Sequence, residues 1–353
     1  MLRSMCSQLN NLLVFRELFS FKQILSGINN FPATVNFLIT NQCNLDCVIC
    51  SAHSMLNKND ELSSAEIIRF IKEIAPAKPA IFLGGGEPFI RNDIFEILDC
   101  IKTRGLKYGI VTNGTLLDEK NIKKLFTVSP EIMIFSVHGD AVSHDAKTGK
   151  QGAFTALSTA IKLAVAQRKK TTILLNSVIT PDNYLDLEKV IIQGKTAGVD
   201  RVRFEQLIFL SQDEYQGHLK ACNRLLTEQE ATMTTYIKDI DCPEIGIKLQ
   251  NEVSRLKKKY RNFIIFKPYL TNSERKKWFA KNFEFKRKCI FLRHSVFIKA
   301  NGDVIPCQFF SNYVLGNIKT DALSVVWQQE KRREFAEILS KKILPGCMRC
   351  CKL

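Results

Sequence analysis

Three cysteines stand within eight residues of one another, at Cys43, Cys47 and Cys50. Three thiolates in so short a segment can bind one face of a compact iron–sulfur cluster. A cluster of four irons needs four ligands, so this C-x3-C-x2-C segment leaves one iron open to a ligand from outside the protein. Open coordination distinguishes catalytic metal sites from closed structural ones, and the segment therefore predicts a redox-active site. A zinc knuckle, or buried thiols without a metal, is the alternative.

A second group of cysteines follows near the C-terminal end, at Cys289, Cys307, Cys347 and Cys350. The chain has 12 cysteines, and charged residues interrupt its N-terminal apolar pieces, so we expect neither a signal peptide nor disulfides. Clustered cysteines in a reducing compartment indicate metal or iron–sulfur ligation. A four-cysteine zinc site makes similar demands, and Cys351 is an alternative ligand to Cys350.

The composition predicts a cytoplasmic globular protein. The 353 residues are 45% hydrophobic, and no apolar stretch is long enough for a transmembrane segment. Residues 1–33 are predicted to form an amphipathic leading segment. The formal net charge of +16 would attract anions such as nucleic acid, but the basic residues are widely spread, so we assign them to solubility. A zinc-binding or RNA-binding protein remains the rival class.

The elements that must position these cysteines alternate between short, β-branched apolar runs and helical patterns. Ser63 and Glu66 have the spacing of a capping box before one such helix. The alternation predicts an α/β fold with parallel strands, and six units suit a partial (β/α)6 TIM-type barrel over residues 34–210. A doubly wound sheet would give the same pattern. The expected strands are residues 34–40, 80–84, 107–112, 131–138, 171–179 and 200–208.

The pattern changes after residue 210. Residues 211–288 are polar and largely helical in composition, and we expect them to connect the barrel to a small C-terminal domain. Within residues 289–353, two apolar runs flank an Asn-Gly-Asp turn and predict a β-hairpin. A helix over residues 322–340 then leads to Cys347, so hairpin and helix together are expected to form a cluster-binding domain.

Glycines and polar residues gather where the expected strands end. Barrel active sites lie at the C-terminal ends of the strands, and consecutive glycines let a backbone approach a ligand closely. We therefore expect these residues to surround a bound ligand. His138, Glu205 and Gln206 are further strand-end candidates, each with a structural alternative. The main candidates are Gly84, Gly85, Gly86, Glu87, Thr112, Ser136 and Asn176.

These motifs together resemble the radical S-adenosylmethionine superfamily. The resemblance implies that Cys43, Cys47 and Cys50 ligate a 4Fe-4S cluster whose open iron is chelated by S-adenosyl-L-methionine. An electron from the cluster then cleaves the sulfonium and yields a 5′-deoxyadenosyl radical, which abstracts a substrate hydrogen. This sequence departs from the family pattern at Ile49, where an aromatic residue usually precedes the third cysteine.

The same resemblance suggests roles for the residues at the strand ends. The Gly-Gly-Glu-Pro motif, whose Glu is Glu87, implies backbone contacts with the methionyl amino group. Thr112 belongs to a strand end found in many members, Ser136 is implied to lie near the ribose, and Asn176 is similar to a polar residue that binds the ribose or carboxylate. His138 stands where the family commonly has Asp.

The C-terminal cysteines resemble the twitch domain, a shortened form of the SPASM domain. Gly302 and Cys307 have its Gly-x4-Cys spacing, and Cys347 and Cys350 its C-x2-C spacing. The resemblance implies one auxiliary 4Fe-4S cluster held by Cys289 and these three cysteines. It also implies a flavodoxin or ferredoxin-type reductant. The expected enzyme oxidises or cross-links a small metabolite or a ribosomally made peptide.

Overall fold

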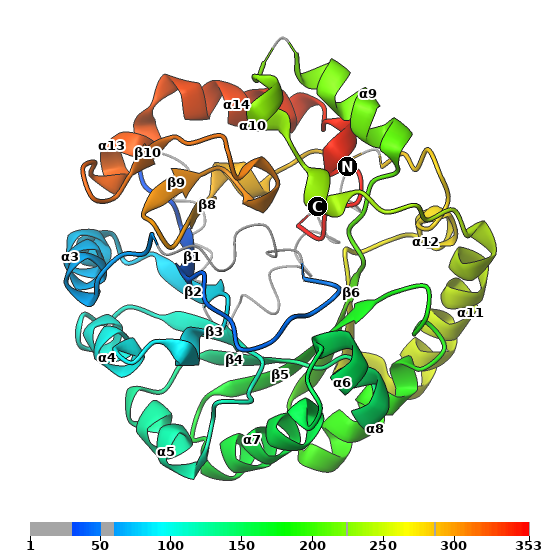
Figure 1. Cartoon of the computed structure of the whole chain (residues 1–353), viewed down its shortest axis with the longest axis horizontal. Coiled ribbons are helices and arrows are strands. Elements are labelled where there is room, and N and C mark those ends of the chain that lie inside the picture. The colour runs from blue at the N-terminus through cyan, green and yellow to red at the C-terminus, as the bar shows by residue number, and fades with distance from the viewer. Residues whose placement is uncertain (1–29, 51–59, 224, 286, 353) are drawn as a thin grey trace.

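The computed structural model describes residues 30–50, 60–223, 225–285 and 287–352. Nearly all of the leading segment predicted for residues 1–33 lies outside these residues. Figure 1 looks along a ring of strands that is surrounded by helices. Among the described residues, no helix combines the length and apolar character needed to cross a membrane.

Six parallel strands form the barrel wall and follow one another in sequence order. Helices connect successive strands and lie outside the ring (Figure 1). Because the strand order never reverses, the predicted partial barrel is confirmed and the doubly wound sheet is excluded. The strands are β1 (Thr34–Thr40), β2 (Ala80–Gly85), β3 (Tyr108–Thr112), β4 (Ile132–Ser136), β5 (Thr172–Ile179) and β6 (Arg201–Gln206). The helices are α3 (Ser64–Ile74), α4 (Ile94–Thr103), α5 (Glu119–Val128), α6 (Ala141–Thr148), α7 (Ala153–Gln167) and α8 (Leu187–Ala197).

Strands from the last third of the chain extend this sheet at both edges. β7 (Ile264–Lys267) pairs parallel with β6, and β8 (Ser295–Ile298) pairs parallel with β1. β9 (Asp303–Ile305) and β10 (Gly316–Asn317) continue antiparallel beyond β8. The predicted hairpin is therefore present, but it belongs to the barrel sheet. Residues 211–288 are largely helical, as expected, but they also contain β7, which was not predicted.

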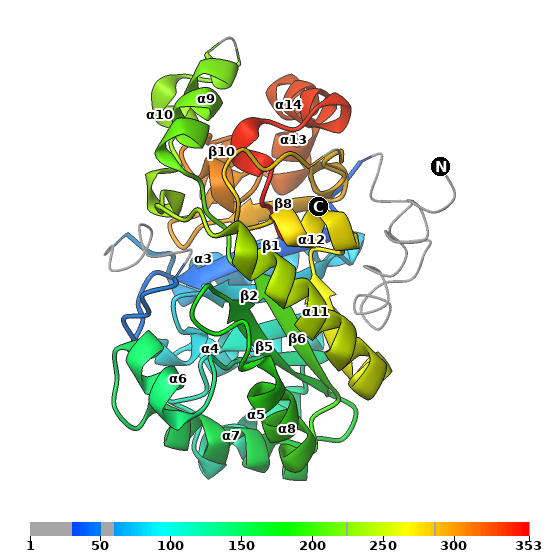
Figure 2. The same cartoon turned by 90° about the vertical axis from the view of Figure 1, so that its right-hand side faces the viewer.

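The remaining helices pack over the top and side of the barrel (Figure 2). They are α9 (Gln212–Cys222), α10 (Glu228–Ala231), α11 (Pro243–Tyr260), α12 (Asn272–Lys277), α13 (Leu323–Gln328) and α14 (Glu330–Lys341). Short 3-10 turns are η2 (Ala75–Ala77), η3 (Pro88–Ile90), η4 (Thr234–Tyr236), η5 (Arg261–Phe263), η6 (Phe291–Arg293), η7 (Gln308–Phe310) and η8 (Pro345–Cys347).

The predicted capping box at Ser63 is confirmed. The Ser63 Oγ accepts a hydrogen bond from the Glu66 amide at 3.3 Å, and the Glu66 carboxylate accepts one from the Ser63 amide at 2.8 Å. Two amides that the first turn of a helix leaves unpaired are thereby satisfied. This cap sets where α3 begins after the segment that carries the first cysteines.

Two apolar layers hold the barrel together. Alternate residues of each strand point outward into the large core that lies between strands and helices. A smaller cluster fills one end of the lumen, and it contains Ala80, Ile132, Ile134 and Leu174. Because this end is filled by apolar side chains, a ligand in the lumen would lie towards the C-terminal ends of the strands.

Arg349 ties the C-terminal tail to the connecting segment. Its guanidinium is buried and donates hydrogen bonds to the carbonyls of Trp278 at 2.9 Å and Ala280 at 2.6 Å. It also pairs with the Glu214 carboxylate at 2.7 Å. Since Arg349 stands between Cys347 and Cys350, these bonds fix the segment that carries the last cysteines.

Gly246 provides a direct test of how the connecting segment packs. A Cβ at this position would overlap the backbone carbonyl of Lys276, so Gly246 is what lets α11 lie against α12. We expect Gly246→Ala to lower the free energy of unfolding by about 1–3 kcal/mol, measured by urea denaturation. Gly217→Ala in α9 is the matched control, since a Cβ there meets nothing within 4 Å, and it should stabilise by about 0.5–1 kcal/mol. Equal effects of the two substitutions would contradict this packing.

Candidate functional site

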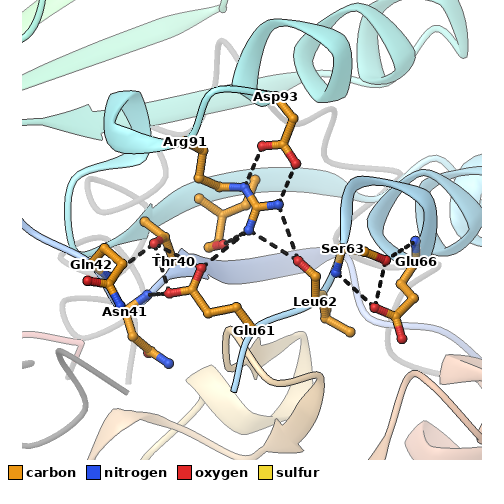
Figure 3. A network of polar contacts seen from close by, with 10 residues as sticks. Thr40, Asn41, Gln42, Glu61, Leu62, Ser63, Glu66, Arg91 and Asp93 are labelled. Carbon is orange, nitrogen blue, oxygen red and sulfur yellow. Dashed lines mark hydrogen bonds and ion pairs between the residues drawn. The ribbon is translucent and has the colours of Figure 1, made fainter. Parts of the chain in front are cut away.

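The first cysteine group lies on a loop, residues 41–50, that leaves the end of β1. Glu61 holds the beginning of this loop (Figure 3). Its Oε1 accepts hydrogen bonds from the Thr40 hydroxyl at 3.0 Å and from the Asn41 amide at 2.5 Å. Its Oε2 lies 3.5 Å from a guanidinium nitrogen of Arg91. The carboxylate therefore fixes the backbone two residues before the first cysteine.

Arg91 in turn holds the Glu61 carboxylate in place through their ion pair. Its guanidinium donates to the Ile39 carbonyl at 3.1 Å and to the Leu62 carbonyl at 3.2 Å. Asp93 binds the other side of the guanidinium with contacts of 2.8 and 2.6 Å (Figure 3). A bidentate carboxylate pair of this kind is geometrically restrictive. Neither Glu61 nor Arg91 follows from the cysteine motif, and no pattern in the sequence indicated their role.

The far end of the cysteine loop rests on the C-terminus of α6. The amides of Asp46 and Val48 donate to the carbonyls of Thr148 and Lys147, both at 3.1 Å. These carbonyls belong to the last turn of the helix, where no intrahelical amide is left to pair with them. Gly149 follows with φ +67° and its Cα lies against Asp46, which leaves little room for a side chain.

The three thiols of this loop lie close enough to influence one another. Burial raises the pKa of Cys47 to about 12, with smaller contributions from the Cys50 and Cys43 thiols. Burial also raises the pKa of Cys43. Without a cation these thiols would stay protonated, whereas a metal cluster binds the thiolate form. Three mutually close, half-buried thiols thus fit the donor set of an iron–sulfur cluster.

The glycine run after β2 packs directly on this loop. The Gly86 amide donates to the Thr40 carbonyl at 2.8 Å. Gly85, with φ +112°, lies against the same carbonyl, and a Cβ at Gly86 would overlap the carbonyl of Gln42. A Cβ at Gly84, in contrast, would meet nothing within 4 Å. Gly85 and Gly86 are therefore required by contact between the two loops, and Gly84 is the glycine that borders open space.

Glu87 is buried and bonded to protein on both carboxylate oxygens. Its amide donates to the Gln42 carbonyl at 2.8 Å. Its side chain accepts from the Thr112 hydroxyl at 2.7 Å, the Asn113 amide at 2.7 Å and the Phe89 amide at 3.2 Å. Burial raises its pKa to about 7 even though these bonds oppose the shift. Glu87 and Thr112 thus link the ends of β2 and β3, and whether either also contacts a ligand stays a prediction.

The turn after β3 completes the frame around the first cysteines. The Asn113 side-chain amide donates to the Asn44 side-chain oxygen at 2.9 Å. Asn44 in turn donates to the Thr115 hydroxyl at 2.8 Å. Since Asn44 follows Cys43, the β3 turn and the glycine run hold the same stretch of the cysteine loop from two sides.

Strand register aligns the predicted residues Ser136 and Asn176 across the lumen wall. Ser136 of β4 pairs with Asn176 of β5, and Asn176 pairs with Arg203 of β6. One step further along, Glu205 of β6 pairs with Lys267 of β7. All five stand on the lumen face, because the residues between them point into the outer core. Alternation along residues 201–206 could have identified Arg203, whereas no sequence signal indicated β7.

The other strand-end candidates lie elsewhere. Gln206 is buried on the outer face of β6, since it is adjacent to Glu205 and neighbouring side chains alternate. His138 and His144 stack with ring centroids 5.8 Å apart, and the His138 amide donates to the His144 Nδ1 at 3.1 Å. Burial lowers the pKa of His138 to about 3 and that of His144 to about 4, so both rings are neutral.

The second cysteine group also comes together in space. The pKa of Cys347 is raised by burial and by the neighbouring Cys307 and Cys289 thiols. The pKa of Cys350 is raised by its hydrogen bond with Cys351, by burial and by Cys347. Cys351 lies within electrostatic reach of the charged side chains of β6. Cys347 thus adjoins Cys289, Cys307 and Cys350, whereas Cys351 adjoins both Cys350 and the charged side chains of β6. Within the described part of the chain, no three His, Cys, Asp or Glu side chains are grouped as ligands of a single metal ion.

Tyr236 lies between the two cysteine groups. Burial raises its pKa, and smaller contributions come from Cys307, Cys351 and Cys350 on one side and Cys50 on the other. A pocket of about 260 Å³ opens beside this tyrosine. Its lining includes Asn41 before the first cysteines, Thr234 and Tyr236 of the connecting segment, and Lys299, Gln308 and Phe309 of the C-terminal region. The connecting segment thus supplies a wall shared by both groups, which the sequence did not indicate.

Arg91 should control how firmly the first cysteine loop retains iron. Arg91→Ala leaves the Glu61 carboxylate without its ion pair and removes the donors to two backbone carbonyls. We expect about tenfold or faster iron loss to a chelator. Arg333→Ala is the matched control, since its exposed side chain makes no hydrogen bond among the described residues, and it should retain iron as the unaltered protein does. Equal retention by the two variants would contradict the role given to Arg91.

The buried histidines predict loss of stability in acid. Their pKa values are lower in the folded chain than the ordinary 6.5, so the unfolded chain binds more protons as the pH falls from 6.5 towards 4. Each such histidine adds up to about 1.4 kcal/mol per pH unit to the slope of the free energy of unfolding against pH. In His144→Asn, the asparagine Oδ1 can accept the hydrogen bond from the His138 amide. The variant should take up about one proton fewer on unfolding, so the free energy of unfolding should depend less steeply on pH. An unchanged slope would show that His144 does not carry the acid sensitivity.

Two different protein families match the two cysteine-containing regions of the chain. Residues 37–192 match the Radical SAM superfamily, and residues 289–351 match SPASM, an iron-sulfur cluster-binding domain. The AdoMet-dependent heme synthase of Methanosarcina barkeri is 32% identical over 175 residues, which are 49% of this chain and 50% of that protein. This chain therefore aligns with about half the length of that relative. The tungsten-containing aldehyde ferredoxin oxidoreductase cofactor-modifying protein of Pyrococcus furiosus is 25% identical over 88% of this chain and 85% of that protein.

Solved structures show the same fold. Streptococcus suis SuiB bound to its precursor peptide SuiA aligns over 93% of this chain and 73% of SuiB, with a TM-score of 0.66 and 17% identity. Native anSMEcpe with bound AdoMet aligns over 90% of this chain and 88% of that chain, with a TM-score of 0.64 and 16% identity. The chain thus contains a radical SAM domain at residues 37–192 and a SPASM iron–sulfur cluster-binding domain at residues 289–351.

Proposed function

We propose that this chain is an enzyme that reductively cleaves S-adenosylmethionine and abstracts a hydrogen atom from its substrate. The observation that carries the proposal is the arrangement of the first cysteine loop. Its three thiols are gathered by contacts at both ends, and the backbone beside them, at Gly84, borders open space. A 4Fe-4S cluster and S-adenosylmethionine, when bound, supply one-electron cleavage of the sulfonium and a strong acceptor of a hydrogen atom.

The residues of the barrel would hold these groups in the following way. Cys43, Cys47 and Cys50 ligate three irons as thiolates, and the fourth iron stays accessible to the amino and carboxylate groups of S-adenosylmethionine. Gly84 offers backbone groups without a side chain in the way. Glu87 keeps the glycine run in place through its bonds to β3. Ser136 and Asn176 pair with one another on the lumen face, and we propose that they bind the ribose and carboxylate.

The second cysteine group is proposed to hold one auxiliary 4Fe-4S cluster. Its proposed ligands are Cys289, Cys307, Cys347 and Cys350, because Cys347 adjoins Cys289 and Cys307 and Cys350 adjoins Cys347, whereas Cys351 also lies near the charged side chains of β6. Tyr236 stands between the two groups, where it excludes water from the space that separates them. We propose the division into a barrel at residues 34–210, a connecting segment at 211–288 and a cluster-binding domain at 289–353, of which the last two each add strands to the barrel sheet.

We further propose that the substrate is a small metabolite or a ribosomally made peptide, and that it is oxidised or cross-linked. The relatives include a heme synthase and AlbA, a protein of subtilosin biosynthesis that is 30% identical to this chain over 148 residues. The pocket beside Tyr236 lies where substrate can approach both cysteine groups. None of the eleven described cysteines forms a disulfide, which suits the cytoplasm and an external flavodoxin or ferredoxin-type reductant.

The experiment measures 5′-deoxyadenosine after the anaerobically reconstituted protein receives S-adenosylmethionine and dithionite. Cys47→Ala should abolish its formation, because the loop then lacks one of its three thiolates. Cys347→Ala should still form 5′-deoxyadenosine while losing about half of the bound iron. Cys100→Ala, on α4 and remote from both groups in sequence, is the control and should match the unaltered protein.

Two results would contradict the proposal. One is a protein that binds zinc without iron, which would restore the structural metal-binding class. The other is a protein with both clusters loaded that forms no 5′-deoxyadenosine with a strong reductant.

A further inference from the structure

The lumen of the barrel contains more positive than negative charge. Three cationic side chains, Arg203 of β6, Lys267 of β7 and Lys352 of the C-terminal tail, lie within electrostatic reach of the single carboxylate of Glu205. Arg203 and Glu205 remain partly exposed, with 15% and 25% of their side-chain surface accessible to solvent. This patch of three cations and one carboxylate, the lumen cation patch, is therefore reachable from outside the barrel.

Arg203 is held rigidly but keeps its binding edge available. Its Nε donates to the Asn176 Oδ1 at 2.7 Å and lies 3.3 Å from the Glu205 Oε1. Its two terminal nitrogens donate no hydrogen bond to any of the described residues. An arginine presents its terminal donors as a planar fork that matches a carboxylate or a phosphate. The bond to Asn176 therefore orients a fork that forms no hydrogen bond with the described residues.

Lys267 increases the need for an anion. Its side chain is buried, and burial together with the Arg203 charge lowers its pKa to about 7. The Lys352 ammonium also lowers the pKa of Lys267, whereas the Glu205 carboxylate raises it. Cations crowded in a poorly hydrated site repel one another, and a bound anion would offset this repulsion.

Asn176, which we propose as a ligand of S-adenosylmethionine, borders the patch at β5, and the part of the patch on the far side of Arg203 favours the substrate as the source of the anion. Arg203 and Lys267 stand on β6 and β7, whereas the cysteine loop and glycine run stand at the ends of β1 and β2 on the other side of the ring (Figure 1). Lys352 follows the last cysteines of the SPASM domain. The patch thus lies on the side of the lumen that adjoins the auxiliary cysteines.

We propose that the lumen cation patch binds an anionic group of the substrate, a carboxylate or a phosphate, and so orients the substrate in the barrel. The inference rests on the proposed function, since it takes the lumen for the place of reaction. Arg203 grips the anion through its two terminal nitrogens, Lys267 adds a buried charge, and Glu205 limits the net charge when the site is empty. Asn176 acts on the anion only through Arg203.

The test measures thermal unfolding of the reconstituted protein in inorganic phosphate or succinate against sodium chloride of equal ionic strength. An anion that binds only the folded state raises Tm, and we expect a rise of about 2 °C or more. Arg203→Gln and Lys267→Met should weaken the apparent affinity about tenfold, and Glu205→Gln should strengthen it. Lys258→Met, which removes an exposed lysine of α11, should leave the anion response unchanged.

Two further measurements test whether the lumen cation patch belongs to the S-adenosylmethionine site or to a cluster site instead. Calorimetric titration with S-adenosylmethionine should give the same affinity in Lys267→Met and in the unaltered protein, and both should contain the same amount of iron. Loss of S-adenosylmethionine affinity would assign the patch to the cofactor, and loss of iron would assign it to the cluster. An absent or unaltered anion response in the variants would likewise overturn the proposal. Formation of 5′-deoxyadenosine is measured separately, so failure of the proposed function is seen independently.

Discussion

The site depends on one backbone contact, where the glycine run after β2 meets the cysteine loop after β1. Two hydrogen bonds join them, from the Gly86 amide to the Thr40 carbonyl and from the Glu87 amide to the Gln42 carbonyl, both 2.8 Å long. Backbones this close leave no room for a side chain at Gly86. The contact requires β1 and β2 to be adjacent and parallel, because only then do their C-terminal ends emerge side by side. The barrel topology thus determines where three thiols can meet.

The rest of the molecule supports this contact from several directions. Glu61 and Arg91 fix the end of β1, α6 supports the far end of the loop, and Glu87 joins the glycine run to β3. β8 lies on the free edge of β1, so the SPASM domain is attached to the strand from which the first cysteine loop leaves. Arg349 then secures the last cysteines against the connecting segment. The two cysteine regions are therefore parts of one sheet rather than separate modules.

The sequence predicted those features that a short motif or a regular period encodes. β1 was predicted at its observed bounds, and the capping box at Ser63 is confirmed. It could not reveal contacts between distant segments, such as Arg91 with the end of β1. β7 was not predicted because its four residues stand in a stretch rich in lysine and aromatic residues. Gln206 was considered beside Glu205 as a substrate-facing residue, although alternation places adjacent side chains on opposite faces.

The glycine run after β2 shows the same limit of sequence-based prediction for single residues. The run at Gly84, Gly85 and Gly86 was expected to bind a ligand as a unit. The structure separates it into two glycines that pack on the cysteine loop and one that borders open space. Sequence spacing cannot make that distinction, because it depends on which carbonyl lies opposite each Cα. The family relationship identifies the chemistry to expect, and the packing identifies the residue that can take part.

The most direct test of the central claim is electron paramagnetic resonance of the reduced, reconstituted protein with isotopically labelled S-adenosylmethionine. If the three-thiolate loop leaves one iron open, label in the methionyl amino and carboxylate groups should give hyperfine coupling to one of the reduced clusters. That coupling should persist in Cys347→Ala, which alters only the auxiliary group. A signal unaffected by S-adenosylmethionine in a protein with a full complement of iron would contradict the account.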